Sequence, residues 1–260
     1  MKRLIQAEWM VVSRRGATRG LLMIAAIVPI LVTVILGFAS ESDLQLNGQN
    51  VTDMVEFSGS HAASVSLRVR HFFVLPMFIL FVTGSAFAAE MSNHTLRERL
   101  IRPVSRDAML GAKSTVLLGL CGFSLAINFV LSAILGTIWM GNNGLWVDVI
   151  VAHIVSLGTD LGLIALGLVL STFFRSGAMV VVLGLVLFAF DKITSLGLSL
   201  LGMFGVESIG VYSAFLPSTG WNAWMVLMEG APWVAVINLC VWTALMILCA
   251  RTRLNRMDVP

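Results

Sequence analysis

Charged side chains are scarce in this sequence. Only 12% of its 260 residues are Asp, Glu, Lys or Arg, whereas 58% are hydrophobic and the mean hydropathy is +0.92. A soluble domain usually carries roughly twice that share of charge. The composition therefore excludes an ordinary soluble protein and indicates an integral membrane protein. The net charge of +3 is small and does not indicate a nucleic-acid-binding surface.

Cysteine is also rare, and Cys121, Cys240 and Cys249 lack the spacing of a metal or redox site. We expect them to be small buried hydrophobic residues. A phosphate-binding loop is missing as well, because Ala112 separates Gly111 from Lys113 and no glycine stands five residues upstream. We therefore expect no metal, no cofactor and no ATP hydrolysis in this chain.

Six apolar runs are long enough to cross a bilayer, which takes about 20 residues in helical form. Only helices with internally paired backbone groups suit such runs. The sequence thus predicts an all-α integral membrane protein, with one transmembrane domain (1–260) forming a bundle of six helices. The predicted spans are residues 21–39, 72–89, 114–140, 147–172, 178–200 and 232–250.

The segment 201–231, before the last span, is predicted to form re-entrant or interfacial structure at the outer face. It is rich in tryptophan: Trp221 and Trp224 lie in it, and Trp233 follows. Tryptophan is enriched at membrane–water interfaces, because the ring is apolar and the indole N–H stays hydrated. An interfacial belt is one interpretation of these residues, and a substrate-contact surface near the exit is the other.

Lysine and arginine are unevenly distributed between the two sides of the predicted membrane. The outer side holds only Arg68 and Arg70, at the end of a polar loop over residues 40–69. Because basic residues are retained in cytoplasmic loops, we predict that both termini and the loop 91–113 are cytoplasmic. The basic residues of that side are Lys2, Arg3, Arg14, Arg15, Arg19, Arg97, Arg99, Arg102, Arg106, Lys113, Arg175, Arg251, Arg253 and Arg256.

The first 20 residues form a cytoplasmic region that contains a moderately amphipathic segment. Ile5, Trp9 and Val12 share one side of a helix, although Glu8 and Arg15 intrude on that apolar side. Such a helix would lie on the membrane surface as an elbow. The alternative is a cytoplasmic extension of the first span. A signal peptide is a weaker interpretation, because the basic region is long and the apolar run that follows has the length of a span.

The densest charged stretch lies between the second and third predicted spans. Thr95 and Glu98 have the spacing of a capping box, and Pro103 ends the resulting helix at Arg102. Ser105 is suited to cap a new helix leading into the third span, with an acidic residue in its first turn. The pattern predicts a short helix, a break and a second helix.

A helix of roughly seven residues is unstable alone in water, so this one must dock on something. Leu96, Leu100 and Ile101 give it an apolar side, which favours a cytoplasmic protein partner. The alternative is a basic loop that fixes topology and rests on anionic lipid headgroups.

The same stretch resembles the signature of ABC-2 type permeases, the membrane subunits of bacterial ABC transporters. Two positions depart from it, His94 where the family usually has Gly and Ala112 between Gly111 and Lys113. Chain length, six spans and the possible elbow helix are also similar. The resemblance rests on Glu90, Thr95-Leu96-Arg97, Leu100, Arg102-Pro103-Val104-Ser105-Arg106, Gly111 and Lys113.

This resemblance implies a permease of the bacterial cytoplasmic (inner) membrane that pairs with a second permease copy, as a homodimer or a heterodimer. A separate ATPase subunit, with its ATP and magnesium, would grip the short helix between spans 2 and 3 as a coupling helix and drive transport, with export as the expected direction. Glu90 would be the acidic residue that ends the second span. The residues implied to bind the ATPase are Thr95, Leu96, Arg97, Glu98, Arg99, Leu100, Arg102, Pro103, Ser105 and Arg106.

Four ionisable residues lie in the interior of predicted spans, away from the span ends, where burying a charge costs several kcal/mol. They are His153, Asp160, Asp191 and Lys192. Each serves either as a gating or substrate-contacting group or as a structural pair between spans. Two hypotheses from other classes also remain: an intramembrane enzyme that uses these groups, and a membrane scaffold or sensor that binds a cytoplasmic partner without transport.

Overall fold

A computed structural model gives the arrangement of the chain. It describes residues 2–42, 45–46, 49–50, 57–72, 74–92, 105–174, 176–203, 215–222, 225 and 233–256. This part of the chain is helical apart from one short antiparallel pair, β1 (Gln45–Leu46) and β2 (Gln49–Asn50). Five helices are long and apolar enough to cross a membrane, and a bent pair of helices makes six if it counts as one span. The predicted all-α membrane architecture is confirmed at this level.

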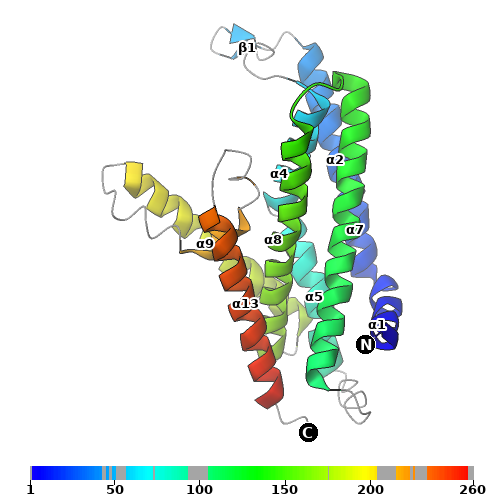
Figure 1. Ribbon diagram of the computed structural model, residues 1–260, viewed down its shortest axis with the longest axis vertical. Coiled ribbons are helices and arrows are strands. Elements are labelled where there is room, and N and C mark those ends of the chain that lie inside the picture. The colour runs from blue at the N-terminus through cyan, green and yellow to red at the C-terminus, as the bar shows by residue number, and fades with distance from the viewer. Residues whose placement is uncertain are drawn as a thin grey trace.

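Each predicted span overlaps one long helix, and within the described residues three shorter helices accompany them. Figure 1 shows α2, α7 and α8 running along the bundle and α9 projecting obliquely from it, with α1 and the end of α13 at the opposite end from β1. The long helices are α2 (Gly16–Glu41), α5 (Val74–Ser92), α7 (Arg106–Met140), α8 (Trp146–Phe173), α9 (Gly177–Met203) and α13 (Trp233–Arg256). The short ones are α1 (Lys2–Ser13), α4 (Gly59–Phe72) and α11 (Pro217–Trp221).

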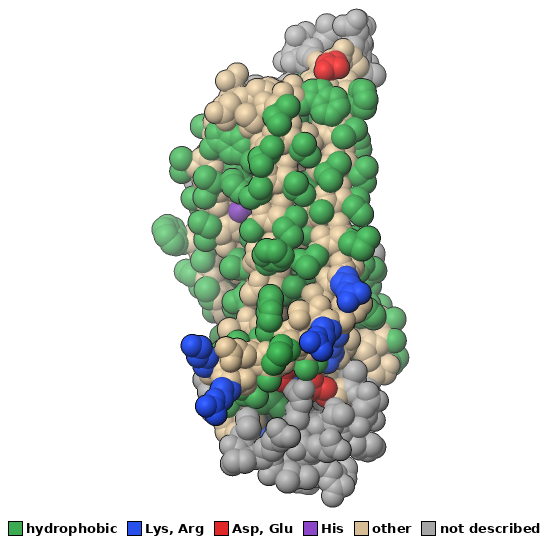
Figure 2. Space-filling view, turned by 90° about the vertical axis from the view of Figure 1, so that its right-hand side faces the viewer, with side chains coloured by type: hydrophobic (Ala, Val, Ile, Leu, Met, Phe, Trp, Pro, Cys, Tyr) green, Lys and Arg blue, Asp and Glu red, His purple; other side chains and the backbone are tan. Residues whose placement is uncertain are grey.

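The outside of the bundle is apolar over its middle part. Figure 2 shows hydrophobic side chains covering one face, with lysine and arginine gathered toward the end of the bundle that holds the chain termini in Figure 1. Ile35, Ile138 and Ile154 are among many large side chains that are more than half exposed, as expected where lipid tails replace water. Cys240 and Cys249 are exposed as well, so the expected burial of the cysteines is wrong for these two and right for Cys121.

The predicted second span is preceded by a helix that the sequence analysis placed in an outer loop. This helix, α4, is bent by 51° relative to the residue 75–88 part of α5. Pro76 explains the break, because it has no N–H for the carbonyl of Phe72 and its ring would clash with that carbonyl in a continuous helix. The two halves differ in their main neighbours: α4 packs chiefly on α2 and α7, whereas α5 packs chiefly on α8 and α9.

The sequence of α4 suggested a loop because it is rich in polar residues. In the structure these residues are buried against protein instead of facing water. Ser60 Oγ donates to the Asn143 carbonyl across 3.2 Å, and the N–H of Gly59 donates to the Gly141 carbonyl across 3.0 Å. Gly144 has a φ of +108°, and a Cβ there would overlap Ser60 Oγ. The α7–α8 turn therefore holds the start of α4 closely.

Helix α11 is packed inside the bundle. The Trp221 ring is buried and stacks on Phe188 with centroids 5.3 Å apart, and Thr159 Oγ1 donates to the Trp221 carbonyl across 3.2 Å. The interfacial-belt interpretation is therefore wrong for Trp221, whose apolar surface has a protein environment. Trp233 is highly exposed, and Trp224 lies outside the described residues.

Candidate functional site

Four charged residues meet at the end of the bundle where α1, α5 and α7 come together; we call Glu8, Arg15, Glu90 and Lys113 the ion cluster. Lys113, on α7, is only 1% exposed. Its Nζ donates to Glu8 Oε2 at 3.0 Å, to Glu90 Oε1 at 2.9 Å and to the Ala86 carbonyl at 3.0 Å. All three donors of the ammonium group are thus used.

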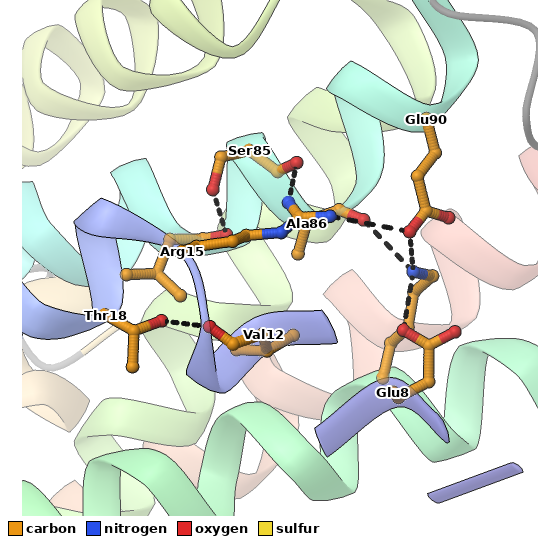
Figure 3. A network of polar contacts seen from close by, with 9 residues as sticks. Glu8, Val12, Arg15, Thr18, Ser85, Ala86 and Glu90 are labelled. Carbon is orange, nitrogen blue, oxygen red and sulfur yellow. Dashed lines mark hydrogen bonds and ion pairs between the residues drawn. The ribbon is translucent and has the colours of Figure 1, made fainter. Parts of the chain in front are cut away.

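Arg15 completes the ion cluster from the junction of α1 and α2. Its Nη1 donates to the Ser85 carbonyl, and its Nη2 lies 3.6 Å from Glu90 Oε1. Figure 3 shows Glu8, Arg15 and Glu90 converging on one place from α1, the α1–α2 junction and α5. Two positive and two negative groups balance there, which is the condition under which charges tolerate burial.

The ion cluster explains the two residues that interrupt the apolar side of α1. Glu8 and Val12 are the buried residues of this helix, which packs on α7, so the position of Glu8 faces protein. The intrusion of Glu8 and Arg15 on the apolar side was visible in the sequence, and it was the available signal that this part of the chain has charged partners in the protein. Their respective partners, Lys113 for Glu8 and Glu90 for Arg15, lie far along the chain and could not be assigned from the sequence.

A second set of contacts ties the start of α7 to the end of α13; we call Arg106, Asp107 and Arg251 the α7–α13 clasp. Arg106 Nη1 donates to the carbonyls of Leu254 and Asn255 at 2.6 and 3.1 Å, near the end of α13 where helical carbonyls lack partners. Arg251 bonds both Asp107 oxygens, at 2.8 and 2.7 Å. Two helices far apart in sequence are thereby joined at one end of the bundle.

The predicted N-terminal cap of α7 is confirmed. Ser105 has an extended backbone, and its side chain accepts a hydrogen bond from the N–H of Ala108 at 3.2 Å. Asp107 stands in the first turn of the helix, as expected, where the helix dipole favours negative charge. The local sequence was sufficient here because a cap depends on residues three apart.

Asp160, on α8, forms a buried ion pair with α4. Arg70 donates through Nη2 to Asp160 Oδ2 at 2.8 Å and through Nη1 to Oδ1 at 3.4 Å. His71 Nδ1 lies 3.1 Å from the Leu67 carbonyl and its Nε2 lies 3.0 Å from Arg70 Nη1. The same Nε2 lies 3.3 Å from Asp160 Oδ1, so His71 contacts both members of the ion pair.

This pair corrects the placement of Arg70. It was predicted to lie in the outer loop, but it is 2% exposed and lies inside the bundle. It stands in the last turn of α4, directly before the break with α5, so Asp160 fixes the chain at that break. Neither Arg70 nor His71 was among the predicted site residues, because a short polar helix gives no hydropathy signal.

The remaining intramembrane candidates have separate environments. Lys192 Nζ donates to Asn222 Oδ1 at 2.5 Å and lies over the Phe188 ring, so Lys192 joins α9 to the residue that follows α11. Asp191 is buried on the same helix. His153 Nδ1 contacts the Val149 carbonyl at 2.7 Å, and its ring packs edge-to-face on Phe129. Among the described residues, no group of His, Cys, Asp and Glu could hold a metal ion.

The comparison with protein-family models decides the class of the protein. Residues 4–204 match the model described as ABC-2 family transporter protein. The chain belongs to this family. The match covers most of the chain and includes every residue of the ion cluster, so the resemblance to ABC-2 type permeases is confirmed. No curated protein matches the permease in a search of such proteins.

Much of the predicted ATPase-binding set lies outside the described residues of the permease. The structure does place the helices on either side: Glu90 near the end of α5, and Ser105 and Arg106 at the start of α7. The ion cluster and the α7–α13 clasp therefore brace the two flanking helices. The predicted residues outside the described part are Thr95, Leu96, Arg97, Glu98, Arg99, Leu100, Arg102 and Pro103.

Proposed function

We propose that the permease forms the translocation pathway of an ATP-driven transporter and that a separate ATPase subunit binds its segment 95–102. One observation carries the proposal: the ion cluster links α5 to α7 on either side of this segment. A segment that passes movement to the membrane needs rigid attachments, because a force on a loosely held loop is lost in the loop. A loop that only rests on lipid headgroups has no such requirement.

The proposed movement starts when ATP closes the partner ATPase subunits and displaces the segment 95–102. Helix α5 receives the displacement near Glu90 and turns about its break with α4, where Asp160 holds Arg70. The α7–α13 clasp carries the same displacement to the last span. Hinge motion of this kind, at the end of a helix, is a common form of domain rearrangement.

The wider arrangement is part of the same proposal. The bent pair α4–α5 counts as one broken span, which gives six. The termini are cytoplasmic in a bacterial inner membrane, since exposed lysine and arginine gather at their end of the bundle. Helix α1 lies along the membrane surface as an elbow, with Trp9 partly exposed to lipid. A second copy completes the pathway, a heterodimer being the alternative, and the substrate is exported.

Leu100→Asp is expected to remove the ATPase subunit from the purified permease while insertion and yield stay normal. A buried leucine contributes about 1.5–3 kcal/mol, so its replacement by a charge weakens binding by roughly tenfold or more. Leu100→Met is the matched control and retains the partner, because it keeps the apolar contact. The measurement is the amount of ATPase subunit co-purified per permease from membranes that contain both chains. Equal amounts for the two variants would refute the docking assignment.

A further inference from the structure

Three helices turn polar side chains toward one another in the half of the bundle away from the ion cluster; we call Ser66, Arg70, Ser124, Asn128, His153 and Asp160 the α4–α7–α8 seam. Three contacts join these helices in pairs. Asn128 Nδ2 of α7 donates to Ser66 Oγ of α4 at 3.0 Å, and Arg70 reaches Asp160 of α8. The His153 ring of α8 lies 4.9 Å from that of Phe129 on α7. Each pair of helices is thus joined by one of these three contacts.

Four polar atoms of the α4–α7–α8 seam are buried without a hydrogen-bond partner in the protein. They are Arg70 Nε, Ser124 Oγ, Asn128 Oδ1 and His153 Nε2. Their residues are 0 to 5% exposed. These atoms come from all three helices, so the lack of protein partners is a property of the shared interface.

Such a concentration of unsatisfied groups is unfavourable in a dry interior. A buried donor or acceptor without a partner loses its hydration and gains nothing in return, and hydrocarbon around the bundle supplies no partner. Internal water is the usual remedy, because one molecule makes about three hydrogen bonds to polar groups of this kind. The buried side chains of Ser66, Cys121, Ser124 and Ser156, which come from all three helices, are small.

We propose that the α4–α7–α8 seam is a binding site for internal water molecules, which link Asn128 and His153 to the Arg70–Asp160 pair. Leu67, Leu125 and Ala152 also pack between the same helices, and they limit the site to single molecules instead of an open channel. The buried Asp160 carboxylate is then in contact with water. The proposal concerns the interior of the permease alone and does not depend on ATPase docking.

Radiolytic hydroxyl labelling of the full-length permease in lipid nanodiscs tests the proposal, because radicals formed from bound water label the side chains beside it. His153 is expected to react at least tenfold faster than Leu168, after correction for intrinsic reactivity. Leu168 is a control on the same helix, at 2% exposure against 5% for His153. Equal corrected rates would mean that the seam is dry and would overturn the proposal.

Ser124→Ala gives an independent energetic test. In a hydrated seam the variant loses a hydrogen bond to water, so its melting temperature stays equal or falls by a few degrees. In a dry seam the variant removes an unpaired hydroxyl, and the melting temperature rises; that result would also overturn the proposal. Ser171→Ala is the matched control: Ser171 is equally buried, but its hydroxyl donates to the Gly167 carbonyl at 2.6 Å.

Discussion

Lys113→Met is expected to reduce the recovery of folded permease severely. The substitution removes the ammonium group that two buried carboxylates, Glu8 and Glu90, share. Removing one partner of a buried ion pair costs about 3–5 kcal/mol, a large part of the roughly 5–15 kcal/mol that holds a typical protein folded. Thermal unfolding and the monodisperse fraction in mild detergent measure the loss.

A double variant separates the charge imbalance from the loss of lysine itself. Glu8→Gln with Lys113→Met removes one negative and one positive group and leaves Arg15 with Glu90. We expect it to recover most of the lost stability, because a balanced cluster no longer holds an excess negative charge. Lys2→Met, at an exposed position of α1, is the surface control and should behave as the wild type. A double variant as unstable as Lys113→Met alone would contradict the assigned role of the ion cluster.

Asp160→Ala is expected to have a comparable effect for the opposite reason. It leaves the Arg70 guanidinium, which is 2% exposed, inside the bundle without its carboxylate. The expected loss is again about 3–5 kcal/mol of unfolding free energy. Because Arg70 stands beside the break between α4 and α5, the orientation of α5 should also become less defined. Thermal unfolding measures the first effect, and spin-label distances between α5 and α8 measure the second.

The neutral pair Arg70→Gln with Asp160→Asn distinguishes structural pairing from a role in transport. Its folding should be close to normal, because neither charge remains to be buried unpaired. If the pair anchors the hinge, the ATP-dependent change in the α5 to α8 distance is lost in this variant although the ATPase subunit still binds. An unchanged ATP response would show that Asp160 serves folding only.

Local and compositional features of the permease followed from the sequence. The long apolar helices did, because a helix that crosses a bilayer needs about 20 predominantly apolar residues. The Ser105 cap also followed from the sequence, because a cap depends on residues three apart. Helix α4 did not: its serines and Arg70 are hidden by other helices, and hydropathy cannot tell polar residues buried in protein from polar residues in water. The break before α5 could have been suspected from Pro76.

The candidate site was accessible from the sequence only in part. Glu90 and Lys113 were noticed through the family-like stretch, and Glu8 as an interruption of an apolar helix face. Their meeting needed the tertiary packing of α1 against α5 and α7. The same holds for Arg70 and Asp160, which lie 90 residues apart. Pairings between distant helices depend on which faces come together, and a single sequence does not state that.

Photo-cross-linking from position 99 tests the central claim most directly. Arg99 is replaced by p-benzoylphenylalanine in one permease, and Asn142, in the α7–α8 turn at the other end of the bundle, is replaced in the control. Irradiation of native membranes should attach the position-99 probe, and not the position-142 probe, to a second chain that carries a phosphate-binding loop. Labelling of lipid alone, or of the same proteins from both positions, would contradict the claim that an ATPase subunit docks on the segment 95–102.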